Sequence, residues 1–241
     1  MNVWLTNLVF WILFFSNSLN LNAAVIVIDK MWSSNTELVV VFLDGDPVLI
    51  DKVKNISQQW LKKTNLSFKF YLSLNTAPNK THIRVSFKSH TGSKLGNQKD
   101  LLSKEATLNL FDLTSSKISD SGAQRLILHE FGHALGLEHE FRSPYWPYNQ
   151  AANAKIIKKC APKMKFLGYS DKKAISKCSE ISSKLKESSV HSTAYDEISI
   201  MNYAIVFTDT KGRFKSIPAQ TELSYLDQYA LQKWYPKRSN D

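Results

Sequence analysis

The chain has 241 residues, of which 43% are hydrophobic, and a formal net charge of +10. That length and apolar content suffice for one globular domain with a sizeable core, in a single lobe or divided between two. Between Lys155 and Glu187, ten lysines stand against three acidic residues. We expect a solvated helical surface there, or one that attracts anionic ligands. Aromatic residues do not interleave with the lysines as in a nucleic-acid groove, so no nucleic-acid partner is expected.

The N-terminal residues 1–23 contain no charged side chain, and Val3–Phe15 is mostly apolar. A polar stretch follows, and Ala23 offers a small residue for cleavage. The segment therefore resembles a secretory signal peptide, although it lacks the usual basic start. An uncleaved membrane anchor is the alternative, but the apolar run is shorter than the roughly 18 residues that span a bilayer. We expect a secreted protein, extracellular or periplasmic, with membrane contact only through residues 1–23.

The next elements combine strand and helix patterns. Leu38–Leu43 is a continuous apolar run that predicts a strand. Asp46 can cap a helix that has Pro47 at its first position and continues to about Lys63. Three further segments predict strands: Ser67–Leu72, His82–Phe87 and Thr107–Asp112.

Two more helices are predicted in the second half of the chain. One runs from about Ser121 to Leu135. The other begins at a capping box formed by Ser224 and Asp227 and continues to about Trp234.

Between these helices lie the two cysteines of the chain, Cys160 and Cys178. In an exported protein an even cysteine count predicts a disulfide, which would stabilise the fold by roughly 3 kcal/mol. Two free, buried thiols are the alternative.

The helix that ends near Leu135 carries the pattern H-E-x-x-H-x-x-G-x-x-H, formed by His129, Glu130, His133, Gly136 and His139. Because a helix turns about 100° per residue, the first two histidines lie on one face and can present ring nitrogens to a single ion. Gly136 permits the left-handed backbone that ends a helix and turns the chain back. His139 can then approach the same ion from outside the helix.

Three neutral imidazoles leave the fourth position of a zinc ion open for water, as in catalytic sites rather than structural ones. Zinc lowers the pKa of such a water to about 7, and Glu130 can take its proton and pass it to a leaving amine. The pattern therefore predicts one catalytic Zn2+ held by His129, His133 and His139, with Glu130 as the general base. The alternative is three helix histidines and a surface glutamate with no metal.

This pattern resembles that of the metzincin zinc peptidases, and the run Gly136–Glu140 is similar to the astacin branch. Downstream, Tyr195–Tyr203 resembles the astacin Met-turn, which implies that Met201 lies beneath the zinc site. The resemblance also implies a catalytic role for Tyr203, which would ligate zinc in the resting enzyme and then stabilise the oxyanion. Asn202 stands where astacins usually carry histidine.

The resemblance implies an α+β, metzincin-type catalytic domain of two lobes, residues 24–136 and 137–241, with the zinc in the cleft between them. The upper lobe would hold a mixed twisted sheet, a backing helix and the zinc-site helix. The lower lobe would be irregular and end in a C-terminal helix. We expect Thr107–Asp112 to be the sheet edge that pairs with a peptide substrate.

Glu140 directly follows the third histidine. In mature astacins the glutamate at this place meets the new N-terminal amine. We therefore expect removal of residues 1–23 to supply such an amine from Ala24. The alternative is an ordinary exposed or internally paired glutamate.

Together these features predict a secreted, monomeric, zinc-dependent endopeptidase that acts on protein or peptide substrates. Two other functions stay open: a catalytically silent protein that binds peptides or surfaces, and a zinc hydrolase that acts on cell-wall crosslinks. A peptidase assay with and without a chelator separates the first from an enzyme. A panel of peptidoglycan and protein substrates separates the second.

Overall fold

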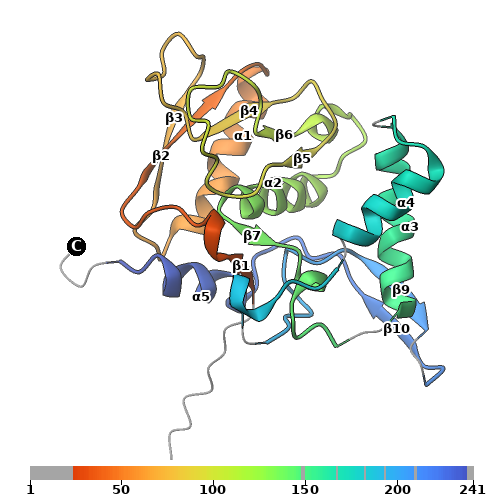
Figure 1. Cartoon of the computed structure of the whole chain (residues 1–241). Coiled ribbons are helices and arrows are strands. Elements are labelled where there is room, and N and C mark those ends of the chain that lie inside the picture. The colour runs from red at the N-terminus through yellow and green to blue at the C-terminus, as the bar shows by residue number, and fades with distance from the viewer. Residues whose placement is uncertain are drawn as a thin grey trace, which may run out of the picture.

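The computed structural model of the protein is shown in Figure 1. The structure describes residues 24–147, 150–166, 168–181, 183–192, 194–208 and 211–237. The predicted signal peptide, residues 1–23, lies outside the described residues. In the described part of the chain, none of the helices is both long and apolar enough to cross a bilayer.

The main sheet has five strands in the order β3-β2-β4-β6-β5. Their bounds are β2 Glu37–Phe42, β3 Ser67–Tyr71, β4 Ile83–Ser86, β5 Gly92–Ser93 and β6 Leu108–Asn109. The first four strands in the order run parallel, and β5 runs antiparallel to β6. β2 lies at the centre of the parallel part, with every residue after Glu37 buried, as expected for a continuous apolar strand.

The prediction that Thr107–Asp112 forms the sheet edge is wrong. β6 contains two residues of that segment and is an inner strand, because the preceding Gly92–Ser93 folds back beside it. The last two residues of the predicted strand, Phe111 and Asp112, belong to a 3-10 helix, η3 (Phe111–Thr114). The hydrogen bond from Lys94 N to Thr107 O, at 2.7 Å, continues the pairing beyond β5. β5 is therefore the edge strand of this sheet.

Two capped helices accompany the sheet. α1 (Pro47–Ser57) begins where the Asp46 side chain accepts hydrogen bonds from the backbone amides of Val48 and Leu49. It passes into a 3-10 turn, η2 (Gln58–Leu61), so the predicted helix changes type before its predicted end. α2 (Asp120–Ala134) begins at Ser119, whose side chain accepts from Gly122 N.

The main core lies between the sheet and these helices. Apolar side chains of the strands and of α1 and α2 form one buried cluster, which includes Phe42, Val53, Val85, Leu128 and Phe131. Trp60 in η2 is buried in the same cluster and donates its indole N–H to Leu128 O at 2.9 Å. Such burial fixes α2 against the sheet, and with it the two histidines that α2 carries.

The remaining elements form the other half of the molecule (Figure 1). The first strand, β1 (Val25–Val27), lies between β7 (Leu137–Glu138) and β8 (Val190–His191) in a small antiparallel sheet. The other strands and helices are α3 Gln150–Phe166, α4 Asp171–Ile181, β9 Ile205–Thr208, β10 Phe214–Ile217 and α5 Tyr225–Trp234. The short 3-10 helices are η1 Ile28–Lys30, η4 Glu140–Arg142 and η5 Glu187–Ser189.

Two sequence predictions in this half are confirmed. α5 begins with the capping box of Ser224 and Asp227, in which each side chain accepts from the other residue's backbone amide. The disulfide joins Cys160 of α3 to Cys178 of α4, with a Cα–Cα distance of 5.8 Å. Both cysteines are buried, so the link lies inside the helical pair.

Candidate metal centre

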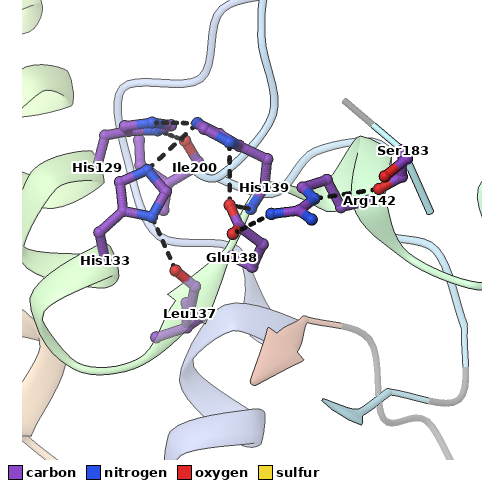
Figure 2. A network of polar contacts seen from close by, with 8 residues as sticks. All are labelled: His129, His133, Leu137, Glu138, His139, Arg142, Ser183 and Ile200. Carbon is purple, nitrogen blue, oxygen red and sulfur yellow. Dashed lines mark hydrogen bonds and ion pairs between the residues drawn. The ribbon is translucent and has the colours of Figure 1, made fainter. Parts of the chain in front are cut away.

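The three predicted ligand histidines meet at one point (Figure 2). His129 and His133 project from the same face of α2, and His139 reaches them from the segment after β7. The Nε2 atom of His139 lies 3.3 Å from that of His129 and 3.2 Å from that of His133. The three histidines that the sequence pattern singles out thus lie together in the structure.

Gly136 makes this convergence possible, as its place in the pattern predicts. Its φ is +99°, a left-handed conformation that strains residues with a side chain. A Cβ atom there would lie 3.1 Å from the carbonyl oxygen of Lys30. The Gly136 amide donates to His133 O at 2.9 Å, and the Gly136 carbonyl accepts from Val27 N at 3.1 Å. The turn is thus tied both to the helix and to β1.

The hydrogen-bond acceptors that face the three Nδ1 atoms determine which ring nitrogens carry protons. Nδ1 of His129 lies 2.9 Å from Ile200 O, and Nδ1 of His133 lies 2.8 Å from Leu137 O. A carbonyl oxygen can only accept, so each Nδ1 must carry the hydrogen. Nδ1 of His139 lies 3.1 Å from the Glu138 carboxylate, which requires the same tautomer. In the neutral rings, all three Nε2 atoms therefore carry bare lone pairs.

The geometry of these lone pairs fits a metal ion. Three unprotonated nitrogens at such short range repel one another unless a cation lies between them. In a tetrahedral zinc site with bonds of about 2.0–2.1 Å, neighbouring nitrogens lie about 3.3–3.4 Å apart. The two distances of 3.3 and 3.2 Å agree with that spacing. Burial also lowers the pKa of His129 and lowers that of His139 to about 4, which favours the neutral ligand form.

The two residues with predicted catalytic roles line a pocket of about 410 Å³ beside the histidines. Glu130 is buried, with 8% of its surface exposed. The Tyr203 ring packs edge-on against His139, with 4.7 Å between the ring centroids. Burial, together with the charges of Glu130 and Glu138, raises the pKa of Tyr203 above its usual value, so its hydroxyl remains a hydrogen-bond donor at neutral pH.

The segment that resembles a Met-turn packs directly against α2. Met201 is fully buried, and a Cβ atom at Gly132 would lie 2.5 Å from its sulfur. Asn202 braces the turn, because its side-chain amide donates to the carbonyls of Asp196 and Glu197 at 2.7 and 3.1 Å. The Asn202 side chain thus stabilises the turn at the position where astacins usually carry histidine.

Glu140 is completely buried and lies near two other buried acids, Asp196 and Asp227. Its carboxylate accepts from Asp196 N at 3.3 Å and from the backbone amide of Ala24. Burial first, and then the charges of Asp227 and Asp196, raise the pKa of Glu140 well above its usual value. The ion pairs found among the described residues include none of the three carboxylates.

Sequence reasoning missed several residues of the site. Glu138 and Arg142 hold His139 in place. An acid and a base four residues apart, next to a predicted metal ligand, could have indicated this ion pair. Arg125 and Lys159 also line the pocket. Arg125 lies one helical turn before His129, but the role of Lys159 depends on how α3 packs and has no local sequence signal.

No protein-family model and no curated protein matches the chain. Among solved structures, one of myroilysin is 28% identical with a TM-score of 0.70, covering 89% of this chain and 99% of the other. A second myroilysin structure is 29% identical with a TM-score of 0.60, covering 86% of each chain. Myroilysin is an astacin-like metalloprotease. The chain is similar to astacin-like metalloproteases over most of its length. The predicted α+β fold and the predicted metallopeptidase class are therefore confirmed.

A third astacin-like structure supports the fold alone. High choriolytic enzyme 1, a hatching enzyme zinc-protease from the medaka fish Oryzias latipes, is 18% identical with a TM-score of 0.53. The match covers 87% of this chain and 96% of the fish enzyme. The astacin-like architecture thus extends over nearly all of the described residues.

Proposed function

We propose that this astacin-like metzincin is an exported endopeptidase that binds one zinc ion through His129, His133 and His139. The observation that carries the proposal is the convergence of three bare Nε2 atoms at the spacing of a tetrahedral site. Zinc, when bound there, would lower the pKa of a coordinated water and polarise the carbonyl group of a peptide. The buried disulfide agrees with an oxidising, extracytoplasmic location.

Two side chains of the pocket would then handle protons and charge. Glu130 follows a ligand histidine directly and faces the pocket without belonging to the ligand group. It would accept a proton from the attacking water and deliver it to the leaving amine. Tyr203, held protonated beside His139, would donate a hydrogen bond to the oxygen that gains negative charge.

The substrate would lie in extended form along β5. Gly92 and Ser93 of this strand line the same pocket as Glu130 and His139. An edge strand has backbone groups available for pairing, so a peptide can add to it as a further strand. This arrangement would hold a scissile bond across the histidine cluster.

The substitution Glu130→Gln tests the division of roles. We expect it to abolish hydrolysis of a fluorogenic peptide while zinc content stays at one ion per chain, because Glu130 is a base and not a ligand. Zinc would be counted by atomic emission in both proteins, and the wild type treated with a chelator serves as the metal-free control. Loss of zinc together with activity, or retained turnover, would contradict the proposed role.

A further inference from the structure

The three histidines are held by different kinds of hydrogen-bond acceptor (Figure 2). His129 and His133 donate to backbone carbonyls, those of Ile200 and Leu137. His139 instead contacts a carboxylate, with its Nδ1 atom 3.1 Å from Glu138 Oε1. The same oxygen accepts the backbone amide of His139 at 2.9 Å. Glu138 thus contacts both the backbone amide and the ring of His139.

The second oxygen of Glu138 is held by an arginine. Arg142 donates from a guanidinium nitrogen to Glu138 Oε2 at 2.7 Å and from Nε to Ser183 O at 3.1 Å. The Arg142 carbonyl accepts from Leu185 N at 2.8 Å. The side chains of Glu138, His139 and Arg142 are 12%, 17% and 18% exposed, so water competes little for these bonds.

His139 needs such support more than the other two histidines. His129 and His133 stand on a buried helix whose backbone fixes their direction. His139 follows a strand of only two residues, β7, and begins the short turn η4. Without a partner its ring could rotate or adopt the other tautomer, and Nε2 would then no longer be presented to the metal.

We propose that Glu138 is a positioning residue for the metal ligand His139, and that Arg142 holds Glu138 in the required orientation. The carboxylate keeps the hydrogen on Nδ1 and leaves the Nε2 lone pair facing His129 and His133. An anionic acceptor also makes the imidazole a stronger electron donor to a metal than a carbonyl does. This inference rests on the proposed function, because it requires the histidine cluster to bind zinc.

The zinc affinity of the full chain tests the proposal. Glu138→Ala should raise the zinc dissociation constant by about 10- to 100-fold, measured by competition with a chromophoric chelator. Glu138→Gln should have a smaller effect, because its amide oxygen can still accept from Nδ1, although its NH2 group cannot accept the hydrogen bond from Arg142. The exposed Glu187 is the matched control, and Glu187→Ala should change the constant by less than about twofold.

A second readout separates positioning from general destabilisation. Nitrogen-15 NMR of the metal-free protein should show His139 as the Nδ1–H tautomer in the wild type and as a mixture of tautomers in Glu138→Ala. Arg142→Met should weaken zinc binding less than Glu138→Ala does. If Glu138→Ala does not fold, Glu138→Gln carries the test through the same two measurements.

The outcomes distinguish this inference from the proposed function. Stoichiometric zinc in the wild type with unchanged affinity and an unchanged His139 tautomer in the Glu138 variants would overturn the inference alone. A wild type that takes up no zinc would overturn both. Weakened affinity with a changed tautomer supports both.

Discussion

At the scale of single residues, the contact between Gly132 and Met201 links α2 to the turn around Met201. Gly132 lies between Glu130 and His133 in the sequence pattern and is buried in α2. An added Cβ would lie 2.5 Å from the Met201 sulfur and 3.1 Å from Trp60. The methionine therefore occupies the volume that a side chain at position 132 would need.

We expect the effect of Gly132→Ala on the free energy of unfolding to depend on whether Met201 is present. Gly132→Ala in the wild type should lower the free energy of unfolding by about 1–3 kcal/mol, because the core becomes overpacked. In a Met201→Ala background the same change should be neutral or raise it by up to about 1 kcal/mol, because alanine favours a helix over glycine. Urea unfolding measures both values. Equal destabilisation in the two backgrounds would show that the contact does not control this position.

A second residue-scale prediction concerns the charge of the substrate. Arg125 donates to the carbonyls of Gln220 and Asn202, both at 2.6 Å, and Lys159 donates to Ala204 O. In the described part of the chain, neither cation forms an ion pair with a carboxylate. Both line the pocket beside Glu130, so an acidic substrate side chain next to the scissile bond would supply the missing counter-charge.

Lys159→Gln should lower kcat/KM for peptides with an acidic residue beside the cleaved bond by roughly fivefold, a modest factor because Lys159 is an exposed side chain. Matched peptides with a neutral residue at that place should change little. Lys158→Gln, on the neighbouring exposed position of α3, is the control. If acidic and neutral peptides lose rate equally in Lys159→Gln, the lysine does not select charge.

At the scale of elements, capped helices were the most predictable parts of the fold. Asp46 with Pro47, and the capping box at Ser224, satisfy free amide groups through nearby side chains, so the sequence contains the whole signal. α2 likewise begins within two residues of its predicted start, at Asp120. The histidine pattern that begins on α2 was equally readable, because the spacing of residues along a helix determines which side chains share a face.

Short strands could not be predicted in the same way. β5 has two residues, Gly92 and Ser93, and neither its length nor its composition favours a strand. Its place at the sheet edge depends on pairing with β6, a long-range contact that local patterns do not encode. The small sheet of β7, β1 and β8 arises in the same way, from strands of two or three residues each.

At the scale of the whole molecule, the N-terminal segment and the second half of the chain share a buried acidic cluster. Glu140, Asp196 and Asp227 are buried, and the charges of the two aspartates act on Glu140. The amide of Ala24, the residue before β1, donates to Glu140. Cleavage after Ala23 would turn that amide into an ammonium group, which would supply a positive charge to the cluster. We therefore expect removal of residues 1–23 to stabilise the fold.

The pH dependence of stability should reveal this charge. Burial raises the pKa of Asp227 to about 6 and also raises that of Glu140. The folded chain then holds protons that the unfolded chain has released, so stability falls as pH rises from about 4 to about 6. A protein with several residues before Ala24 should show this loss, measured by thermal unfolding. One that begins at Ala24 should show a flatter profile, because its ammonium group favours the ionised acids.

Glu140→Gln is the control for that comparison. It removes one carboxylate, so in the protein with residues before Ala24 it should reduce the loss of stability between about pH 4 and about pH 6. In the protein that begins at Ala24 it should increase that loss. Identical pH profiles with and without the extension would contradict a role for the new N-terminus.

The account depends most directly on the coordination of the metal by three imidazoles. X-ray absorption spectroscopy on wild-type protein loaded with zinc, together with a metal count, measures this coordination. We predict one zinc per chain, with three imidazole nitrogens at about 2.0–2.1 Å and one further light ligand. Absence of stoichiometric zinc, or a spectrum that requires fewer than three imidazoles, would contradict the account.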